Sequence, residues 1–456
     1  MFRKVLVANR GECARRIIRT CQRLDIATVA VYSEADASAP HVRDADEAYL
    51  VGPAPVPQSY LDHSAVLDAV SRSGADAVHP GWGLLSENPE FAEGVHGVGA
   101  CFIGPSPELL RAFGDKLSAR RLAEKAGLAL PPGTGHAASV DEETALWSEA
   151  EAIGYPLMVK AAAGGGGIGM ARVEDPGALL AAVQACTARA QGAFGDATVY
   201  FEKYLDRPRH IELQLVADGA GCVRILGERE CSVQRRHQKI VEEGPSPAAH
   251  IDHSDLAAWR QKSVVLFESC GFAGAGTVEF IVEPSGEMYF LEVNPRLQVE
   301  HAVTEMCTGI DIVEEQLRVA AGAGLSPQAE SPKSEGHAIE ARIYAEDPAR
   351  KFLPQPGTLR RLVWPERSAD LRIESGVVEG DVVTPYYDPM IAKLIAVGVD
   401  RTAAIKRLDC ALSELSIELV GPKGPKATNV SFLRTVLGSS AFVSADYATD
   451  LVASLG

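Results

Sequence analysis

Paired cysteines are missing from this sequence. Nine cysteines are scattered over 456 residues, and none belongs to a Cys-x-x-Cys pair. An odd and scattered set argues against a disulfide framework and against a cysteine zinc site, and it is typical of proteins in a reducing compartment. We therefore expect the protein to work in the cytoplasm.

Long apolar runs are missing as well. A membrane-spanning helix needs a run of about 18 or more apolar residues, and no such run occurs. Residues 1–16 carry charges too early and too often for the apolar stretch of a signal peptide. The net charge of −17 argues against a broad surface for nucleic acid, although it is compatible with a local basic pocket for a nucleotide. We expect neither a membrane nor a nucleic acid as partner.

Two common nucleotide-binding motifs are absent. The sequence contains no Gly-Lys pair, which excludes a Walker phosphate loop. Gly164, Gly166 and Gly169 fit G-x-G-x-x-G, but a strand-like segment follows them instead of a helix, and no acidic residue lies about 20 positions further on. The glycines therefore favour a hairpin whose backbone N–H groups cover the phosphates of a nucleotide. The alternative is an ordinary flexible loop.

The composition is that of a globular protein, and the length suggests about three domains. Strand-like segments at 4–8, 27–31 and 75–79 alternate with helical ones at 13–24 and 65–70, which predicts a doubly wound parallel sheet.

The pattern changes after residue 130. Apolar segments at 156–163 and 170–173 flank the glycines and predict the two strands of the hairpin. Alternating strands such as 211–216, and a helix over 310–321, follow in the region that extends to about residue 446.

Three lysines are candidate clamps for a phosphate or for bicarbonate: Lys116, Lys160 and Lys239. Lysine suits this role because its ammonium is a compact point charge. A solvated surface position is the alternative for each of them. That alternative is weakest for Lys160, which ends an apolar strand directly before the glycines.

Two carboxylates interrupt apolar strands. Glu279 lies in the sequence TVEFIV and Glu292 in MYFLEV, with Asn294 close behind. Because a buried carboxylate must be paired or bound to a cation, these oxygen donors indicate a Mg²⁺ site. The alternative is a pair of solvent-facing carboxylates on half-buried strands.

The segment after Asn294 concentrates reactive side chains. Arg296, Gln298 and Glu300 alternate, so in an extended segment they would project to one side. A guanidinium, an amide and a carboxylate could hold a small planar oxyanion and take its proton. The alternative is a polar strand edge stabilised by Arg–Glu pairing. His210 and His237 lack the spacing of metal ligands, so we do not expect zinc.

Together these segments resemble biotin carboxylase, the ATP-grasp component of biotin-dependent carboxylases, along nearly the whole chain. The segments that carry the resemblance are 7–12 (VANRGE), 31–36 (VYSEAD), 79–83, 86–88, 160–170, 234–243, 292–305 and 336–348 (GHAIEARIYAEDP). The chain departs from the family pattern at Trp82, Leu84, Ile168 and residues 420–428.

The resemblance implies a multidomain α/β and α+β fold. Its parts are an N-terminal Rossmann-like domain, a helical linker, an ATP-grasp lid, an ATP-grasp core, a C-terminal mixed-sheet domain and a tail, over residues 1–114, 115–130, 131–203, 204–333, 334–446 and 447–456.

The resemblance also implies a role for each site residue. ATP would be bound by Lys116, Lys160, Gly166, Gly167, Glu202, Lys203, Tyr204, Leu205, His210, Gln234, His237, Glu279 and Ile281. The magnesium (or manganese) ions would be bound by Glu279, Glu292 and Asn294. Bicarbonate would be held by Lys239, Arg296, Gln298, Val299 and Glu300, with Glu300 as the base. Biotin would lie against Trp82 and Arg342, and the catalytic residues would be Arg296, Glu300, Lys239 and Arg342.

The implied reaction uses ATP and bicarbonate to carboxylate biotin through carboxyphosphate. Biotin would be carried by a separate protein, since no methionine is followed by lysine and the usual attachment motif is Met-Lys-Met. A carboxyltransferase would complete an acetyl-CoA or propionyl-CoA carboxylase, and the chain would form a homodimer. Three alternatives stay open: a pyruvate or urea carboxylase, another ATP-grasp ligase that joins a carboxylate to an amine, and a nucleotide-sensing regulator without turnover.

Overall fold

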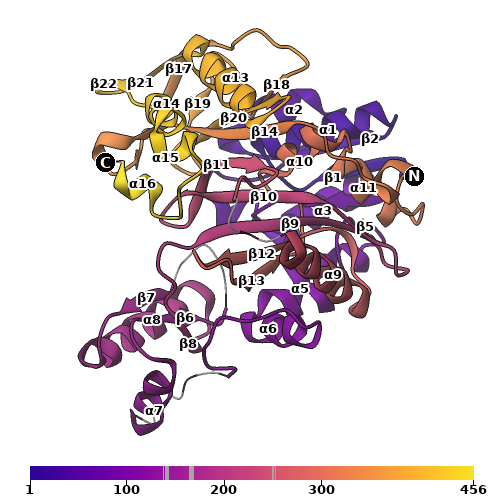
Figure 1. The fold of residues 1–456 in the computed structure, drawn as a ribbon. Coiled ribbons are helices and arrows are strands. Elements are labelled where there is room, and N and C mark those ends of the chain that lie inside the picture. Colours follow the sequence, from indigo (N-terminus) through magenta and orange to yellow (C-terminus); the bar gives the residue numbers. More distant parts are fainter. Residues whose placement is uncertain (137, 139–142, 164–168, 249–250, 252, 456) are drawn as a thin grey trace.

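The computed structural model describes residues 1–136, 138, 143–163, 169–248, 251 and 253–455. Five sheets organise this part of the chain, and Figure 1 shows the lid with helices α7 and α8 projecting from the larger body. No helix within these residues is long and apolar enough to cross a membrane.

The N-terminal domain contains the predicted parallel sheet. Its strands lie in the order β3, β2, β1, β4, β5 and are all parallel, which confirms the doubly wound prediction. The strands are β1 (Lys4–Val7), β2 (Ala27–Ser33), β3 (Glu47–Gly52), β4 (Ala77–His79) and β5 (Cys101–Phe102). The helices are α1 (Gly11–Arg23), α2 (Pro40–Asp44), α3 (His63–Ser73), α4 (Pro89–Gly97) and α5 (Pro107–Gly114), and α6 (Lys116–Lys125) follows in the expected linker.

Local signals set the ends of these helices. The carboxylate of Asp62 accepts the Ala65 N–H at 3.1 Å and caps α3, which ends at Gly74 in the left-handed conformation. Helix α1 buries Cys13, Ile17 and other apolar residues against the sheet. Arg16 and Arg19 of α1 donate hydrogen bonds to Glu305 and Glu374, so α1 also connects the N-terminal domain to the later part of the chain.

The lid is a small unit with its own core. It contains β6 (Leu157–Ala161), β7 (Met170–Val173), β8 (Val199–Lys203), α7 (Glu143–Ile153) and α8 (Leu179–Phe194). Strands β6 and β7 are antiparallel with Lys160 opposite Met170, which confirms the hairpin. The glycines between them, including Gly166 and Gly167 and the neighbouring Ile168, lie outside the described residues.

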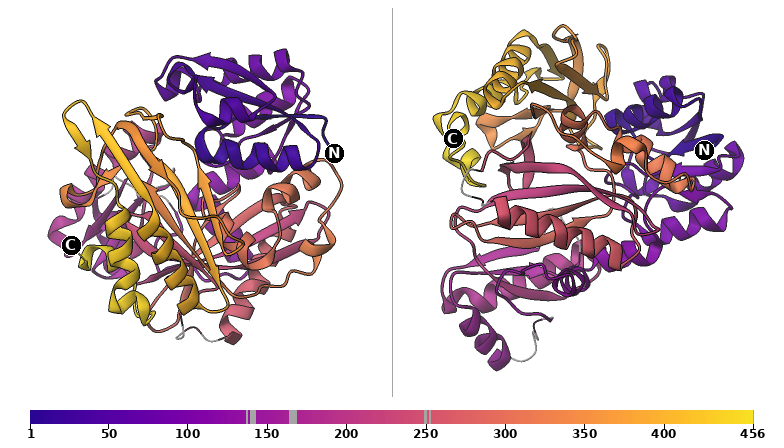
Figure 2. Two further views of the ribbon diagram at one scale, coloured as in Figure 1. Left: turned by 90° about the horizontal axis from the view of Figure 1, so that it is seen from above. Right: turned by 45° about the vertical axis from the view of Figure 1, so that its right-hand side comes forward.

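An eight-stranded antiparallel sheet forms the centre of the molecule. Its order is β13, β12, β9, β10, β11, β14, β20, β18. The strands are β9 (Arg209–Asp218), β10 (Val223–Arg235), β11 (Gln238–Gly244), β12 (Ala273–Val282), β13 (Met288–Asn294), β14 (His337–Tyr344), β18 (Leu371–Ser375) and β20 (Met390–Gly398). Because β11 pairs with β14, one sheet continues across the boundary expected at residue 333 (Figure 2).

Alternation along these strands separates the core from the site. In β9, Ile211 and Leu213 pack in the same apolar cluster as Phe267 of helix α9 (His253–Ser269). Glu212 therefore points to the opposite face, as the period of two in a strand requires. The same alternation places Val278 in the core and Glu279 on the face of Glu212.

The C-terminal part combines strands β14, β18 and β20 with a second sheet in the order β19, β17, β21, β22. The described pairings are antiparallel, so the expected mixed sheet was wrong in this respect. The remaining strands are β15 (Glu346–Asp347), β16 (Leu353–Pro354), β17 (Gly357–Val363), β19 (Val382–Val383), β21 (Ser416–Gly421) and β22 (Gly424–Lys426). The remaining helices are α10 (His301–Thr308), α11 (Ile312–Ala320), α12 (Pro327–Glu330), α13 (Arg401–Glu414), α14 (Val430–Gly438), α15 (Ser440–Val443) and α16 (Leu451–Ser454).

The expected tail packs against this part of the molecule. Tyr447, Leu451 and Val452 are buried in one apolar cluster with Leu433 and Phe442. Residues 447–455 are therefore integrated into the C-terminal core.

Candidate active site

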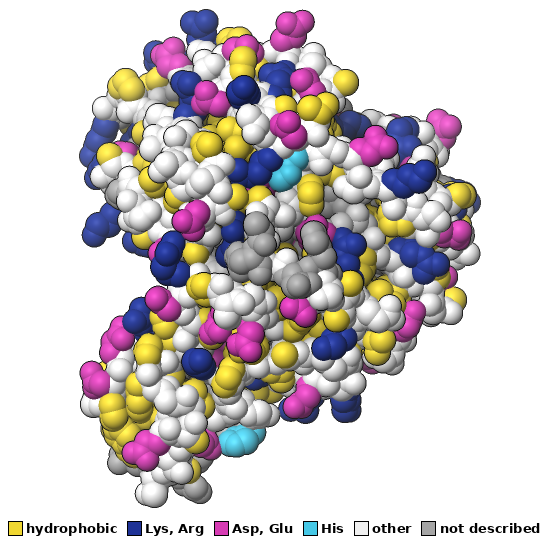
Figure 3. Space-filling model, in the orientation of Figure 1, with side chains coloured by type: hydrophobic (Ala, Val, Ile, Leu, Met, Phe, Trp, Pro, Cys, Tyr) yellow, Lys and Arg dark blue, Asp and Glu magenta, His cyan; other side chains and the backbone are white. Residues whose placement is uncertain are grey.

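A cavity of about 800 Å³ lies between the lid and the central sheet, and Figure 3 shows the surface hollowed between the lid and the rest of the molecule. It is lined by every predicted site residue that the structure describes: Trp82, Lys116, Lys160, Glu202, Lys203, Tyr204, Leu205, His210, Gln234, His237, Lys239, Glu279, Ile281, Glu292, Asn294, Arg296, Gln298, Val299, Glu300 and Arg342. Residues from the strands of the central sheet and from the lid thus meet in one place.

Lys239 is the centre of a buried ionic network. Its Nζ lies 2.6 Å from an oxygen of Glu212, 2.8 Å from one of Glu279 and 2.6 Å from one of Glu300. Burial lowers the pKa of Lys239, but the three carboxylates outweigh burial and raise it well above its usual value. Lys239 is therefore charged at neutral pH.

Glu300 is held between two cations. Besides its bond to Lys239, its second oxygen accepts a hydrogen bond from Arg342 Nη2 at 2.9 Å. Burial raises the pKa of Glu300, but Lys239 and Arg342 lower it well below its usual range. The same Arg342 nitrogen lies 2.5 Å from Glu242, whose pKa burial raises to about 7 in spite of Arg342. At neutral pH Glu300 is therefore ionised, whereas Glu242 is only partly ionised.

The carboxylates of β12 and β13 form one wall. Glu279 lies directly opposite Glu292 in the strand register, and Asn294 Nδ2 donates to Glu279 at 2.9 Å. Glu292 approaches Lys116 Nζ at 3.4 Å. Oxygen donors on neighbouring strands are the ligands that Mg²⁺ prefers, so this wall fits the predicted metal site.

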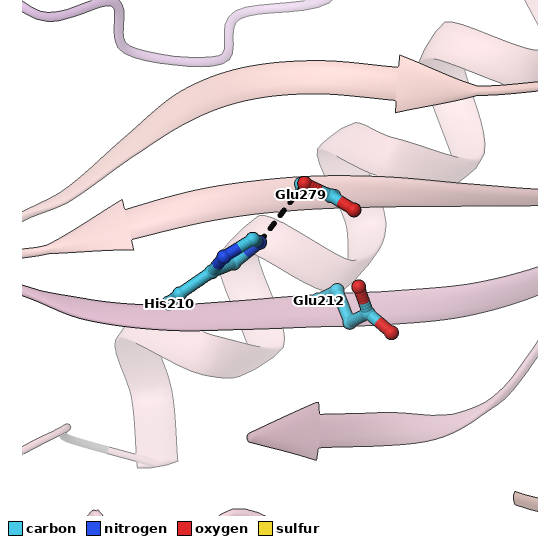
Figure 4. A group of neighbouring side chains, drawn as sticks. All are labelled: His210, Glu212 and Glu279. Carbon is cyan, nitrogen blue, oxygen red and sulfur yellow. Dashed lines mark ion pairs between the residues drawn. The ribbon is translucent and has the colours of Figure 1, made fainter. Parts of the chain in front are cut away.

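His210 extends the wall toward the lid. Its Nε2 lies 2.9 Å from Glu279, and Figure 4 shows both side chains beside Glu212. One ligand atom from each of these three residues lies within 4.8 Å of the others, a grouping that could hold a metal ion. Burial lowers the pKa of His210, but Glu279 raises it above its usual value overall. Spacing along the chain does not reveal this cluster, because Glu279 joins His210 and Glu212 of β9 only through the pairing of β12 with β9.

The predicted extended segment after Asn294 was wrong. Residues 295–300 form no strand, and helix α10 begins at His301. Arg296 nevertheless points into the cavity, where its Nη2 donates to Asn294 at 2.9 Å and its Nη1 to Gln298 at 3.2 Å. Its Nε pairs with Glu87 of the N-terminal domain. Arg296 therefore joins two domains at the cavity.

The nucleotide side of the cavity combines cations with apolar walls. Lys160 and Arg120 both pair with Glu202, which is buried at the end of the lid sheet. Leu205 is buried, and Ile281 lines the cavity from the central sheet, so both offer apolar surface to a flat group such as a nucleotide base. Lys160, the lysine predicted as a phosphate clamp, lines this cavity.

Sequence reasoning missed three charged residues of the network. Glu212 and Glu242 surround Lys239 and Arg342, and Arg229 Nε pairs with Glu212 at 2.5 Å. All three side chains are completely buried. Glu212 lies between Ile211 and Leu213 and interrupts an apolar strand as Glu279 does, so the same signal could have found it. Glu242 is followed by Glu243 and gives no such signal.

The comparisons with known proteins cover the whole chain. Residues 1–110 match the family described as biotin carboxylase, N-terminal domain, and residues 340–454 match the biotin carboxylase C-terminal domain. Residues 115–328 match the ATP-binding domain of the carbamoyl-phosphate synthase L chain. The central match covers the strands that carry the carboxylate wall.

Full-length relatives carry the same name. Biotin carboxylase 2 of Bacillus subtilis is 48% identical over 452 residues and covers 99% of both chains. Biotin carboxylase of Haemophilus influenzae is 48% identical over 420 residues, which are 92% of each chain. The structure of a biotin carboxylase complex from Campylobacter jejuni superposes with a TM-score of 0.94 at 40% identity, over 100% of this chain and 99% of that one.

The N-terminal parallel sheet, the lid and the carboxylate-lined central sheet define an ATP-grasp ligase. Within that class the chain belongs to the biotin carboxylase family, as its identity to full-length members shows. The resemblance inferred from the sequence motifs is confirmed.

Proposed function

We propose that this chain carboxylates biotin, using MgATP and bicarbonate, on a separate carrier protein. The observation that carries the proposal is Glu300, an ionised carboxylate held by Lys239 and Arg342 at the floor of the cavity. Binding of a nucleotide alone requires no such base. The arrangement therefore supports turnover over a nucleotide-sensing role.

In the first half of the reaction, different residues would bind bicarbonate, remove its proton and hold the magnesium ions. Lys239, Arg296, Gln298 and Val299 would hold bicarbonate, and Glu300 would take its proton. A bicarbonate oxygen would then form a bond to the γ-phosphorus of ATP while the bond to ADP breaks, which gives carboxyphosphate. Magnesium bound at Glu279, Glu292 and Asn294 would neutralise the phosphate oxygens.

The second half of the reaction needs a proton acceptor for biotin. Carboxyphosphate would break into CO₂ and phosphate, and the phosphate would accept the proton of the biotin nitrogen that attacks CO₂. Arg342 would stabilise the negative charge that develops on the ureido oxygen. Trp82 lines the same cavity and would contact biotin.

The partners follow from the family. We propose a biotin carrier protein and a carboxyltransferase, with an acyl-CoA such as acetyl-CoA or propionyl-CoA as the final acceptor. The propionyl-CoA carboxylase alpha chain of Ruegeria pomeroyi is 44% identical. A pyruvate carboxylase component from Methanothermobacter thermautotrophicus is 45% identical, so pyruvate is the competing acceptor. We further propose a cytoplasmic homodimer, since a biotin carboxylase domain at 38% identity has been solved as a dimer with MgADP and bicarbonate.

ATP hydrolysis should depend on both ions. We expect the purified chain to hydrolyse ATP only with Mg²⁺ and bicarbonate present, and to do so faster when free biotin is added. The reason is that the base and the metal carboxylates serve one reaction, in which bicarbonate is the nucleophile. Phosphate release in carefully degassed buffer, with and without added bicarbonate, is the measurement. Rapid hydrolysis that ignores bicarbonate would contradict the proposal.

Biotin should be attached to another polypeptide. After coexpression with a biotin ligase we expect the intact mass of this chain to be unchanged, because none of its six methionines precedes a lysine. Adding a biotinylated carrier should raise the carboxylation rate above that with free biotin, since tethering raises the local concentration. A biotin-sized increment on this chain would overturn the expectation.

A further inference from the structure

The loop that carries Val299 and Glu300 is held from behind by two buried side chains. His301 Nδ1 lies 2.7 Å from the carbonyl oxygen of Gln298. Lys393 Nζ donates to the carbonyl oxygen of Val299. Neither His301 nor Lys393 lines the cavity, and both are buried. They therefore contact the loop from outside the cavity.

These two contacts fix the two peptide groups on either side of Val299. A trans peptide is planar, so the position of a carbonyl determines the direction of the next N–H. Holding the Gln298 carbonyl thus directs the Val299 N–H, and holding the Val299 carbonyl directs the Glu300 N–H and the start of its side chain. Those are the groups proposed to bind bicarbonate and to take its proton.

Burying the charged side chain of Lys393 costs desolvation free energy, which suggests a role other than stabilising the fold. Its side chain is completely buried, and its ion-pair partner Glu12 lies 3.5 Å away. A buried ion pair of this kind is weak evidence for stability, because desolvation cancels much of the attraction. Burial lowers the pKa of Lys393, but Glu12 and Glu340 raise it above its usual value, so the donor stays charged. Because the donor is a charged ammonium, its hydrogen bond to the Val299 carbonyl oxygen is a strong one.

The lysine is itself held in place by a connection to the cavity wall. The other oxygen of Glu12 accepts a hydrogen bond from Trp82 Nε1 at 3.2 Å. Trp82, Glu12, Lys393 and Val299 therefore form a continuous chain of polar contacts. Lys393 also lies directly opposite Arg342 in the register of β14 and β20.

We infer that Lys393 and His301 are positioning residues that orient the bicarbonate-binding loop by fixing the carbonyl groups of Val299 and Gln298. The inference rests on the proposed function, since it assigns these residues to the same site. A purely structural role is the competing explanation. The two differ because positioning affects the use of bicarbonate, whereas loss of structure affects both substrates.

The test uses a double variant that removes the charge of Lys393 together with that of its ion-pair partner Glu12. In Lys393→Met/Glu12→Gln we expect the apparent KM for bicarbonate to rise by about 10-fold or more, since small misplacements of reacting groups cost up to about 100-fold. The apparent KM for ATP should change by less than about twofold, because the nucleotide contacts lie elsewhere in the cavity. The thermal midpoint should be measured on the same preparation.

A matched control is available in the N-terminal domain. Lys4 also pairs with a glutamate, Glu47 at 2.6 Å, and also donates to a backbone carbonyl, that of Ser73 at 2.8 Å. Lys4→Met/Glu47→Gln should leave both KM values unchanged. For His301, Asn provides a donor near Nδ1 and Leu does not, so His301→Asn should restore most of the bicarbonate affinity that His301→Leu loses.

The outcomes separate the two proposals. An unchanged bicarbonate KM in folded Lys393→Met/Glu12→Gln, or an equal rise of both KM values, would refute the positioning role while the proposed function stands. Wild-type protein that hydrolyses ATP without regard to bicarbonate would refute the proposed function itself.

Discussion

Replacing Glu300 by glutamine is expected to abolish most of the turnover while ATP affinity remains. The change keeps the size and shape of the side chain but removes its ability to accept a proton. Loss of a general base costs about 10²–10⁴ in rate, so the bicarbonate-dependent ATPase should fall by about that factor. The affinity for ATP should stay within about twofold, because the base contributes to proton transfer and does not bind the nucleotide. Rates and nucleotide affinity are measured on the same preparation.

The electrostatics explain why this carboxylate can serve as the base. Lys239 and Arg342 outweigh burial and keep the pKa of Glu300 low, so the proton-accepting form is fully populated at neutral pH. The arrival of bicarbonate and ATP brings negative charge, which raises the pKa of a carboxyl and strengthens it as a base. Substrate binding would thus activate Glu300 at the moment when it is needed.

Glu242→Gln is the matched control for this variant. Glu242 also contacts Arg342, but it does not line the cavity and its pKa of about 7 leaves it partly protonated at neutral pH. Its amide analogue should therefore lose less than about 10-fold in rate, because no base is removed. Equal losses in the two variants would show that Glu300 acts only as a partner of Arg342. Unchanged turnover in Glu300→Gln would remove it from the mechanism.

Much of the site was predictable from local sequence, for a physical reason. A strand alternates with a period of two, so a carboxylate within an apolar run points to one face while its neighbours build the core. Glu279 and Glu292 show this pattern, and both line the cavity. The hairpin of β6 and β7 was predictable because its two apolar segments are close in sequence.

What could not be predicted depends on contacts between distant segments. Lys239 meets Glu279 and Glu300, which lie 40 and 61 positions away in sequence, through the order of strands in the central sheet. The pairing of β11 with β14 joins two expected domains and carries no local signal. The segment after Asn294 was mispredicted as extended because its alternating side chains resemble a strand, although the chain turns there to begin α10.

Lys239→Met is expected to have the second large effect, on both turnover and stability. Removal of one preorganised donor costs about 10²–10³ in rate, and here the donor also orients the base. Breaking a buried ion pair by removing one partner costs about 3–5 kcal/mol. Glu212, Glu279 and Glu300 keep Arg229, His210 and Arg342 as their other charged neighbours, so we expect a folded but less stable protein. Turnover and thermal unfolding between pH 5 and pH 8 are the measurements.

The loss of stability in Lys239→Met should depend on pH, and the pKa values of the neighbouring carboxyls set its direction. In the wild type the pKa values of Glu279 and Glu300 lie below the ordinary 4.5, so these groups stabilise the fold above pH 4.5, and that stability is lost only as the pH falls through the lowered values. Without Lys239, burial prevails and raises both pKa values, so the groups favour the folded state at low pH and oppose it as the pH rises. The deficit in thermal midpoint of Lys239→Met should therefore widen from pH 5 to pH 8. Lys239→Arg retains the charge, so it should lose turnover through altered geometry while the deficit stays constant with pH. A deficit in Lys239→Met that does not depend on pH would mean that Lys239 does not control the ionisation of these carboxylates.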